Sequence, residues 1–159
     1  MAVLFVFVWL ASALWVGRAQ QPGANTGAAD PIAEIASLTR DRGAWLHVDG
    51  AFGLWAATSE TRRHLVTGIE RADSIATDGH KWLNVPYDCG YAFIADAESH
   101  RASMSHRAAY LVHDEDARDQ IDWNPEWSRR GRGFPTYAAL RQLGRDGVAN
   151  LVERCCKHA

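Results

Sequence analysis

Short segments rich in apolar and β-branched residues alternate along the chain with longer amphipathic or polar stretches. Three of these segments predict buried strands, at residues 44–48, 72–77 and 90–95. The other stretches predict helices or helical turns, at residues 31–42, in part of 59–71, at 134–143 and at 146–157. Such alternation is typical of an α/β fold with a mostly parallel sheet and flanking helices.

Helix boundary signals and a charged region refine this outline. Asp30 is a residue type that caps helices, Pro31 suits the first helical position, and Gly43 suits the position after the last turn. Residues 97–131 are charged and show no clear period, so we expect an irregular region that includes a loop reaching a partner.

The first 18 residues differ in composition from the rest. Residues 2–17 are apolar apart from Ser12, which suits the core of a signal peptide or a buried strand, but no basic residue precedes the run. Both alternatives stay open. We therefore divide the chain into an apolar N-terminal segment, 1–18, and one domain over 19–159.

Composition narrows the classes of partner. A chain of 159 residues, 47% of them hydrophobic and 23% charged, is long enough for one globular core. Seventeen basic residues against 19 acidic ones give a net charge of −2, so no nucleic acid partner is expected. We expect a cytoplasmic protein without a membrane partner, although the apolar first segment leaves a signal or an anchor open.

Two chemically distinctive positions follow predicted strands. Asp49 comes directly after the strand at 44–48, and a turn that ends in Lys81 comes after the strand at 72–77. Because the carboxyl ends of parallel strands meet at one edge, we expect both side chains in the same crevice. A lysine amine can form a Schiff base with an aldehyde, and an ionised aspartate can keep a pyridine nitrogen protonated, which makes the ring an electron sink.

The same segments carry a resemblance to a known family. HVDGAFG at 47–53, followed by DSIATDGHKWLNVPYDCG at 73–90, resembles the group II pyridoxal-phosphate-dependent amino acid decarboxylases, which have the aspartate-aminotransferase-like fold, fold type I. Two flanking segments agree, AQQPGANTGAADP at 19–31 and SRRGRGFPTYAALRQLGRDGV at 128–148. The resemblance implies that residues 19–159 are part of the family's large domain.

The resemblance also implies roles for individual residues. Lys81 matches the lysine that forms a Schiff base with pyridoxal 5′-phosphate, and His80 matches a histidine beside it, near the phosphate. Asp49 matches the aspartate at the pyridinium nitrogen, Ala51 the small residue under the ring, and Thr26 a threonine close to the ring. Lys81 and His80 are thus the candidate catalytic residues, all five are candidate cofactor-binding residues, and no metal is implied.

The activity implied is that of a carboxy-lyase that decarboxylates an L-amino acid, in a protein that is a homodimer when full length. The chain is shorter than a typical family member, and neither the N-terminal portion nor the small C-terminal domain of the family has a counterpart in it. We therefore expect the chain to bind pyridoxal phosphate poorly and to have no decarboxylase activity alone. The amino acid substrate is not implied.

Two other functions stay open at this point. His47, Asp49, Asp78 and His80 supply nitrogen and oxygen ligands suited to zinc, as in a metal-dependent hydrolase, although Lys81 would place a cation beside that site. A truncated, non-catalytic fragment that packs against a full-length partner is the other. Asp78 also departs from the family, because many members have asparagine there, near the phosphate. A carboxylate there would repel the phosphate unless it pointed away from that group.

Overall fold

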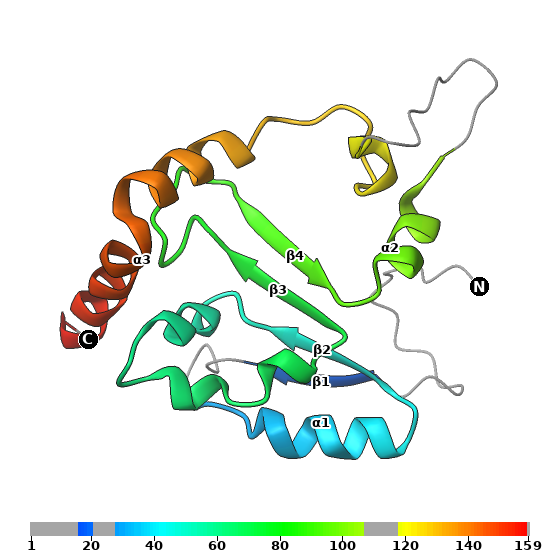
Figure 1. Cartoon of the computed structure of the whole chain (residues 1–159), viewed down its shortest axis with the longest axis horizontal. Coiled ribbons are helices and arrows are strands. Elements are labelled where there is room, and N and C mark those ends of the chain that lie inside the picture. The colour runs from blue at the N-terminus through cyan, green and yellow to red at the C-terminus, as the bar shows by residue number, and fades with distance from the viewer. Residues whose placement is uncertain (1–15, 21–27, 107–117, 159) are drawn as a thin grey trace. The chain divides into compact units, whose positions relative to one another are not determined.

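The computed structural model describes residues 16–20, 28–106 and 118–158 (Figure 1). It divides into two compact units. The described residues of the larger unit are 16–20, 28–93 and 131–158, and those of the smaller unit are 94–106 and 118–130. Thr26, one of the candidate cofactor residues, and residues 1–15 lie outside the described part of the chain.

A four-stranded sheet forms the centre of the larger unit, in the order β1-β2-β3-β4. The strands are β1 (Val16–Gln20), β2 (Trp45–Asp49), β3 (Ser74–Asp78) and β4 (Gly90–Ile94). β2 pairs in parallel with both β1 and β3, whereas the arrows of β3 and β4 run in opposite directions in Figure 1. The predicted α/β class and the three predicted strands are confirmed, with boundaries that shift by one or two residues.

One face of β2 is buried because its side chains alternate between two sides of the sheet. Leu46 and Val48 are 1% and 0% exposed, whereas His47 and Asp49 are half-buried on the opposite face. The apolar face packs against α1 (Ile32–Asp41), which lies beside β1 and β2. The resulting core cluster consists of Ile32, Ala36, Leu46, Val48 and Ala72.

The start of α1 differs from the predicted one. Pro31 takes the N-cap position with ψ 74° and makes no side-chain cap bond, so the assignments of Asp30 as N-cap and of Pro31 as the first helical residue are wrong. The backbone N–H of Ile32 donates instead to the carbonyl oxygen of Asp30 at 2.9 Å. The end is as predicted: Gly43 follows the C-cap with φ +59°, a conformation that favours glycine.

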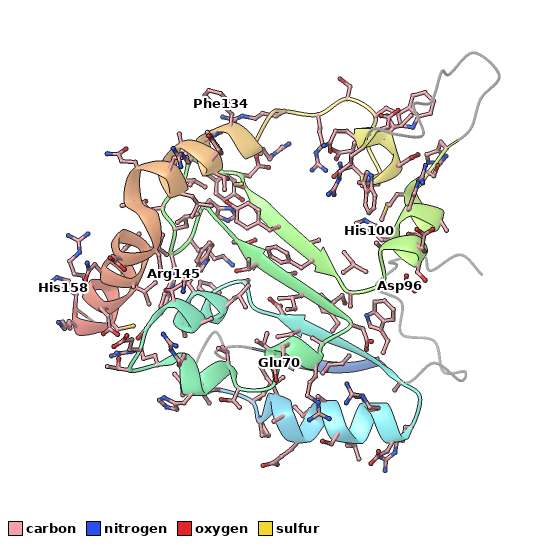
Figure 2. The ribbon with its side chains drawn as sticks, in the orientation of Figure 1. Glu70, Asp96, His100, Phe134, Arg145 and His158 are labelled. Carbon is pink, nitrogen blue, oxygen red and sulfur yellow. The ribbon has the colours of Figure 1, made fainter. Side chains whose placement is uncertain are left out.

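The long helix α3 (Gly133–His158) consists of two helical segments that meet at Gly144, where φ is 62° and ψ −174°. This break confirms the two helices predicted at 134–143 and 146–157. Val148 and Val152 are buried in the second segment, whereas Phe134 at the start of the first is 80% exposed (Figure 2). A second core cluster packs α3 against the chain that follows β3, through Leu83, Val85, Cys89 and Val148.

Three 3₁₀ helices occupy the connection between β2 and β3, and the last two lie within residues 59–71, where the sequence predicts partial helix. They are η1 (Gly53–Thr58), η2 (Arg63–Val66) and η3 (Ile69–Arg71). Glu153 of α3 binds this connection through hydrogen bonds. Its Oε1 accepts one from the buried Ser59 hydroxyl and one, at 2.7 Å, from Thr61 Oγ1. Arg62 Nη1 lies 3.2 Å from Glu153 Oε2.

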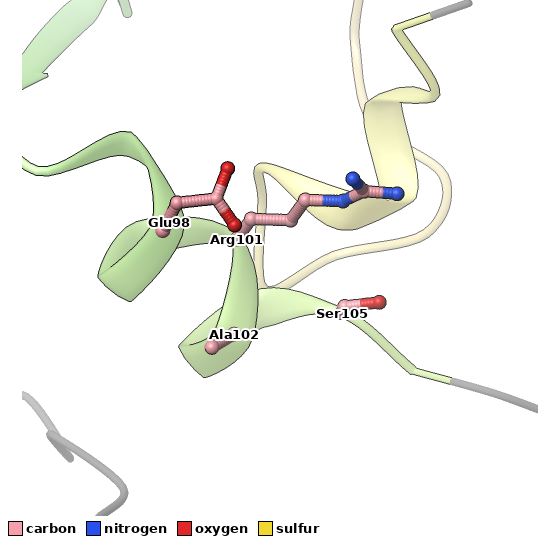
Figure 3. Close-up of a pocket in the computed structure, with 4 residues that line it drawn as sticks. All are labelled: Glu98, Arg101, Ala102 and Ser105. Carbon is pink, nitrogen blue, oxygen red and sulfur yellow. The ribbon is translucent and has the colours of Figure 1, made fainter. Parts of the chain in front are cut away.

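The smaller unit contains α2 (Ala97–Met104) and η4 (Gln120–Asp122). The prediction of an irregular region is therefore wrong for residues 97–104, where Asp96 caps the helix by accepting from the Ser99 N–H at 3.1 Å. The buried Asp122 holds the two elements together, because its carboxylate accepts from Arg101 Nε at 3.1 Å and Ser105 Oγ at 2.7 Å. A pocket of about 260 Å³ lies along α2 (Figure 3), lined by Glu98, Arg101, Ala102 and Ser105.

The predicted N-terminal segment 1–18 is described only from Val16, the first residue of β1. The signal-like alternative rests on residues outside the described part. Among the residues that are described, none of the helices combines the length and the apolar character needed to span a membrane. The predicted partner-reaching loop falls partly within 107–117, which is also outside the described residues.

Candidate functional site

The turns that carry the candidate residues follow two adjacent parallel strands. Asp49 is the last residue of β2, and Lys81 stands three positions beyond the end of β3. The pairing continues past the strand end, because the Gly50 N–H donates to the Ala76 carbonyl at 2.7 Å and Thr77 Oγ1 donates to the Gly50 carbonyl at 2.8 Å. The two turns are thereby fixed to one another at the carboxyl edge of the sheet.

The turn after β2 presents the Asp49 carboxylate. Its Oδ1 accepts a hydrogen bond of 3.2 Å from the N–H of Ala51, so the small candidate residue also orients the acid. Gly50 is required between them: a Cβ there would lie 2.9 Å from the Leu54 Cβ and 3.1 Å from the Ala76 carbonyl oxygen. A residue larger than glycine would therefore not fit directly after Asp49 without movement of its neighbours.

The Lys81 ammonium group has two neighbours. Nζ lies 2.7 Å from Asp78 Oδ2 and 3.8 Å from the centroid of the Phe52 ring, while 27% of the side chain is exposed. Phe52 stands three residues after Asp49, so its contact with Lys81 joins the turn after β2 to the turn after β3. An ammonium group over an aromatic face is an attractive arrangement.

His80 is held by the backbone of Cys89 just before β4. Its Nδ1 lies 3.0 Å from the Cys89 nitrogen and 2.9 Å from the Cys89 oxygen, and its ring meets Tyr87 edge-on at 4.5 Å between centroids. Nε2 lies 3.8 Å from Asp78 Oδ2. The backbone pairing fixes one ring nitrogen and directs the other towards the turn that carries Lys81.

Behind the turn, close packing fixes its backbone. A Cβ at Gly79 would lie 2.1 Å from the Tyr91 hydroxyl oxygen, so only glycine fits at this position without movement of the ring. The Tyr91 hydroxyl and Thr136 Oγ1 are 2.7 Å apart, and burial is the main cause that raises the pKa of Tyr91 to about 12. Trp55 Nε1 donates to the Asp78 carbonyl at 3.2 Å.

Four of the five predicted cofactor residues, Asp49, Ala51, His80 and Lys81, thus lie in two turns at one edge of the sheet, and Thr26 is outside the described residues. Sequence analysis missed the contact of Phe52 with Lys81 and the pairing of Asp78 with the same amine. The opposite charges of Asp78 and Lys81, three positions apart in one turn, were a signal for that pair.

The arrangement gives no support to a metal-dependent hydrolase. His47 Nδ1 lies 2.8 Å from the Ser74 hydroxyl, while Nδ1 of His80 is paired with Cys89. Across the described ranges, no three His, Cys, Asp or Glu side chains gather closely enough to hold a metal ion. The four residues proposed for a zinc site do not form one.

The same residues fit pyridoxal phosphate by their chemistry. Lys81 supplies a partly exposed amine, a group that can react with an aldehyde, and Asp49 supplies a carboxylate at the neighbouring strand end, a group that can bind a ring nitrogen. Ala51, between Gly50 and Phe52 in the same turn, has a small side chain. Lys81 would hold the aldehyde carbon and Asp49 the ring nitrogen.

Comparisons with known proteins agree with this chemistry. The 4-hydroxyphenylacetaldehyde synthase of Rhodiola rosea is 34% identical over 80% of this chain and 25% of its own length. The aspartate 1-decarboxylase of Aliivibrio fischeri is 34% identical over 85% of this chain and 24% of its own. A crystal structure of Oryza sativa TDC with PLP and tryptamine matches with a TM-score of 0.79 and 27% identity, over 85% of this chain and 28% of that one.

The chain spans about a quarter of the length of the curated relatives that it matches. Within that span the agreement is continuous, since the model of the pyridoxal-dependent decarboxylase conserved domain matches residues 15–159. The match includes both turns of the candidate site, and the structural neighbours have fold type I. The chain therefore belongs to the family of pyridoxal-dependent decarboxylases.

Proposed function

We propose that this chain carries the aldehyde-binding lysine and the ring-binding aspartate of a pyridoxal-phosphate-dependent carboxy-lyase that decarboxylates an L-amino acid. The observation that supports it most is the placement of Lys81 and Asp49 after adjacent parallel strands, with Phe52 of the Asp49 turn against the Lys81 ammonium at 3.8 Å. An amine and a carboxylate at one sheet edge are the two groups that the chemistry requires.

Lys81 has the central role in this proposal. Its nitrogen would hold the cofactor's aldehyde carbon and release it when the amino group of the substrate takes its place. Pyridoxal phosphate, once bound, supplies an electron sink for the electron pair that the leaving carboxylate releases. The Lys81 side chain is partly exposed, at 27%.

The other candidate residues would orient and bind. The Asp49 carboxylate would bind the ring nitrogen, and the Ala51 N–H orients the carboxylate by donating a hydrogen bond to it. The small side chain of Ala51 would lie under the ring. His80, oriented by Cys89, would stand near the phosphate, and Thr26 near the ring.

The partners and the compartment belong to the same proposal. The substrate would be a free amino acid, and the full-length protein would be a cytoplasmic homodimer. The names of the relatives cover both an aspartate decarboxylase and an enzyme named for an aromatic aldehyde, so they leave the side chain of the substrate open.

The proposal is tested by locating the lysine that captures the cofactor. The chain is incubated with pyridoxal phosphate, reduced with borohydride and digested, and the pyridoxyl label is mapped by mass spectrometry. Lys81 and Lys157 are the two lysines of the sequence, so Lys157→Ala is the matched control for Lys81→Ala. We expect the label at Lys81 and its loss only in Lys81→Ala; a label that favours Lys157 or the N-terminal amine would refute the proposal.

A further inference from the structure

The Lys81 amine is partly exposed to solvent, and a carboxylate also lies within hydrogen-bond distance of it. Asp78 Oδ2 is 2.7 Å from Nζ, and both side chains are about a quarter exposed, 24% for Asp78 and 27% for Lys81. His80 Nε2 approaches the same oxygen at 3.8 Å. The Phe52 ring covers the ammonium from another side, with its centroid 3.8 Å away. The carboxylate and the aromatic face are both attractive contacts for the ammonium group.

The backbone around Asp78 is held in place by its neighbours. Asp78 is the last residue of β3, it follows the buried Thr77, and its carbonyl accepts from Trp55 Nε1 at 3.2 Å. The next residue, Gly79, is bonded through its N–H to the Cys89 carbonyl at 2.9 Å. The carboxylate therefore extends from a rigid backbone, and the longer lysine side chain adapts to it.

We propose that Asp78 is a positioning residue that sets the reactivity of Lys81, by holding the side-chain nitrogen in an ion pair over Phe52 until a carbonyl compound arrives. A protonated amine has no free electron pair and is not a nucleophile. To react, Lys81 releases one proton to water, its electron pair bonds to the carbonyl carbon, and the carbonyl oxygen leaves as water with the two remaining hydrogens. This inference rests on the proposed role of Lys81 as the aldehyde-binding lysine.

The test measures the reactivity of Lys81 without any cofactor. Trace amounts of acetic anhydride are added at a fixed neutral pH, and acetylation of Lys81 is measured relative to Lys157 in the same molecule by mass spectrometry. Lys157 is exposed near the end of α3 and serves as the internal reference. In Asp78→Asn, which keeps the size of the side chain but removes its charge, we expect the ratio to rise about fivefold, the effect of a partly exposed ion pair.

Three further variants separate this role from a structural one. Asp78→Glu keeps a carboxylate at this position, and its ratio is expected to be close to that of the wild type. Asp78→Ser removes the charge in a second way and should behave like Asp78→Asn. Glu126→Gln breaks another ion pair of the same spacing, with Arg129 at 3.3 Å, and should leave the ratio unchanged. Circular dichroism identifies the variants that are folded.

A ratio that stays constant or falls in a folded Asp78→Asn or Asp78→Ser protein would overturn the inference, as would a ratio in Asp78→Glu as high as in Asp78→Asn. The outcome is independent of the proposed function: if pyridoxal phosphate labels neither lysine while the acetylation ratio rises as expected, the proposed function fails and the control of Lys81 by Asp78 stands. If both hold, borohydride trapping of pyridoxal phosphate at Lys81 should also be faster in Asp78→Asn.

Discussion

Thr77 Oγ1 donates a hydrogen bond of 2.8 Å to the carbonyl oxygen of Gly50, and this bond connects the ends of β3 and β2 just where the candidate site begins. Thr77 is 2% exposed, so both polar groups are buried. Together with the Gly50 N–H to Ala76 bond of 2.7 Å, it sets the spacing between the turn that carries Asp49 and the turn that carries Lys81.

Replacing Thr77 by valine should therefore destabilise the protein. The substitution keeps the shape but removes one of two donors to the Gly50 carbonyl, the other being the Leu54 N–H at 3.1 Å. The expected loss is about 0.5–1.5 kcal/mol in the free energy of unfolding. Urea denaturation measures it. Thr67→Val is the control, because Thr67 is exposed and its hydroxyl bonds only within its own turn, to the His64 carbonyl. Equal losses in the two variants would contradict the importance of the Thr77 bond.

Gly79→Ala should destabilise the protein through Tyr91. The added Cβ would lie 2.1 Å from the Tyr91 hydroxyl oxygen, and overpacking of this kind costs about 1–3 kcal/mol. Tyr91→Phe removes that atom, so the double variant should lose less stability than the sum of the two single variants. Thermal unfolding of the four proteins forms the cycle; strict additivity would show that the two residues do not meet.

The anchoring of α3 through Glu153 should depend on pH. Hydrogen bonds from Ser59, the largest cause, and Thr61 hold the pKa of Glu153 below its usual value. A carboxyl group whose pKa is lower in the folded state stabilises the protein above the pKa of the unfolded chain and loses this effect as the pH falls through the folded value. The stability difference between the wild type and Glu153→Gln should thus shrink on acidification below the ordinary carboxyl range; a difference that grows there would contradict this account.

Much of the larger unit follows from local patterns in the sequence. The alternation around Leu46 and Val48 predicts β2 and its buried face, and Gly43 marks the end of α1. The helix at 97–104 was missed because none of its residues is buried, so it has no apolar period to detect. Its stabilising contact, the bond from Ser99 to the Asp96 cap, is a local polar one.

The candidate site also has features that the sequence predicts and features that it does not. Asp49 and Lys81 could be predicted because both follow strands, and parallel strands place their ends at one edge. The contact of Phe52 with Lys81 could not, because it depends on how two turns fold towards one another after their strands end. The pairing of Lys81 with the Asp78 carboxylate likewise depends on the side-chain conformation of the lysine within the turn, which spacing alone leaves open.

The central claim is that Asp49 and Lys81 act on one pyridine ring. It is tested most directly by the amount of pyridoxyl label trapped at Lys81 in Asp49→Asn, at a fixed, subsaturating concentration of pyridoxal phosphate. Loss of a charge-assisted bond to the ring nitrogen should lower the labelling about tenfold. Asp41→Asn, an exposed position at the end of α1, is the matched control and should label like the wild type. Equal labelling of Lys81 in folded Asp49→Asn and Asp41→Asn would contradict the claim.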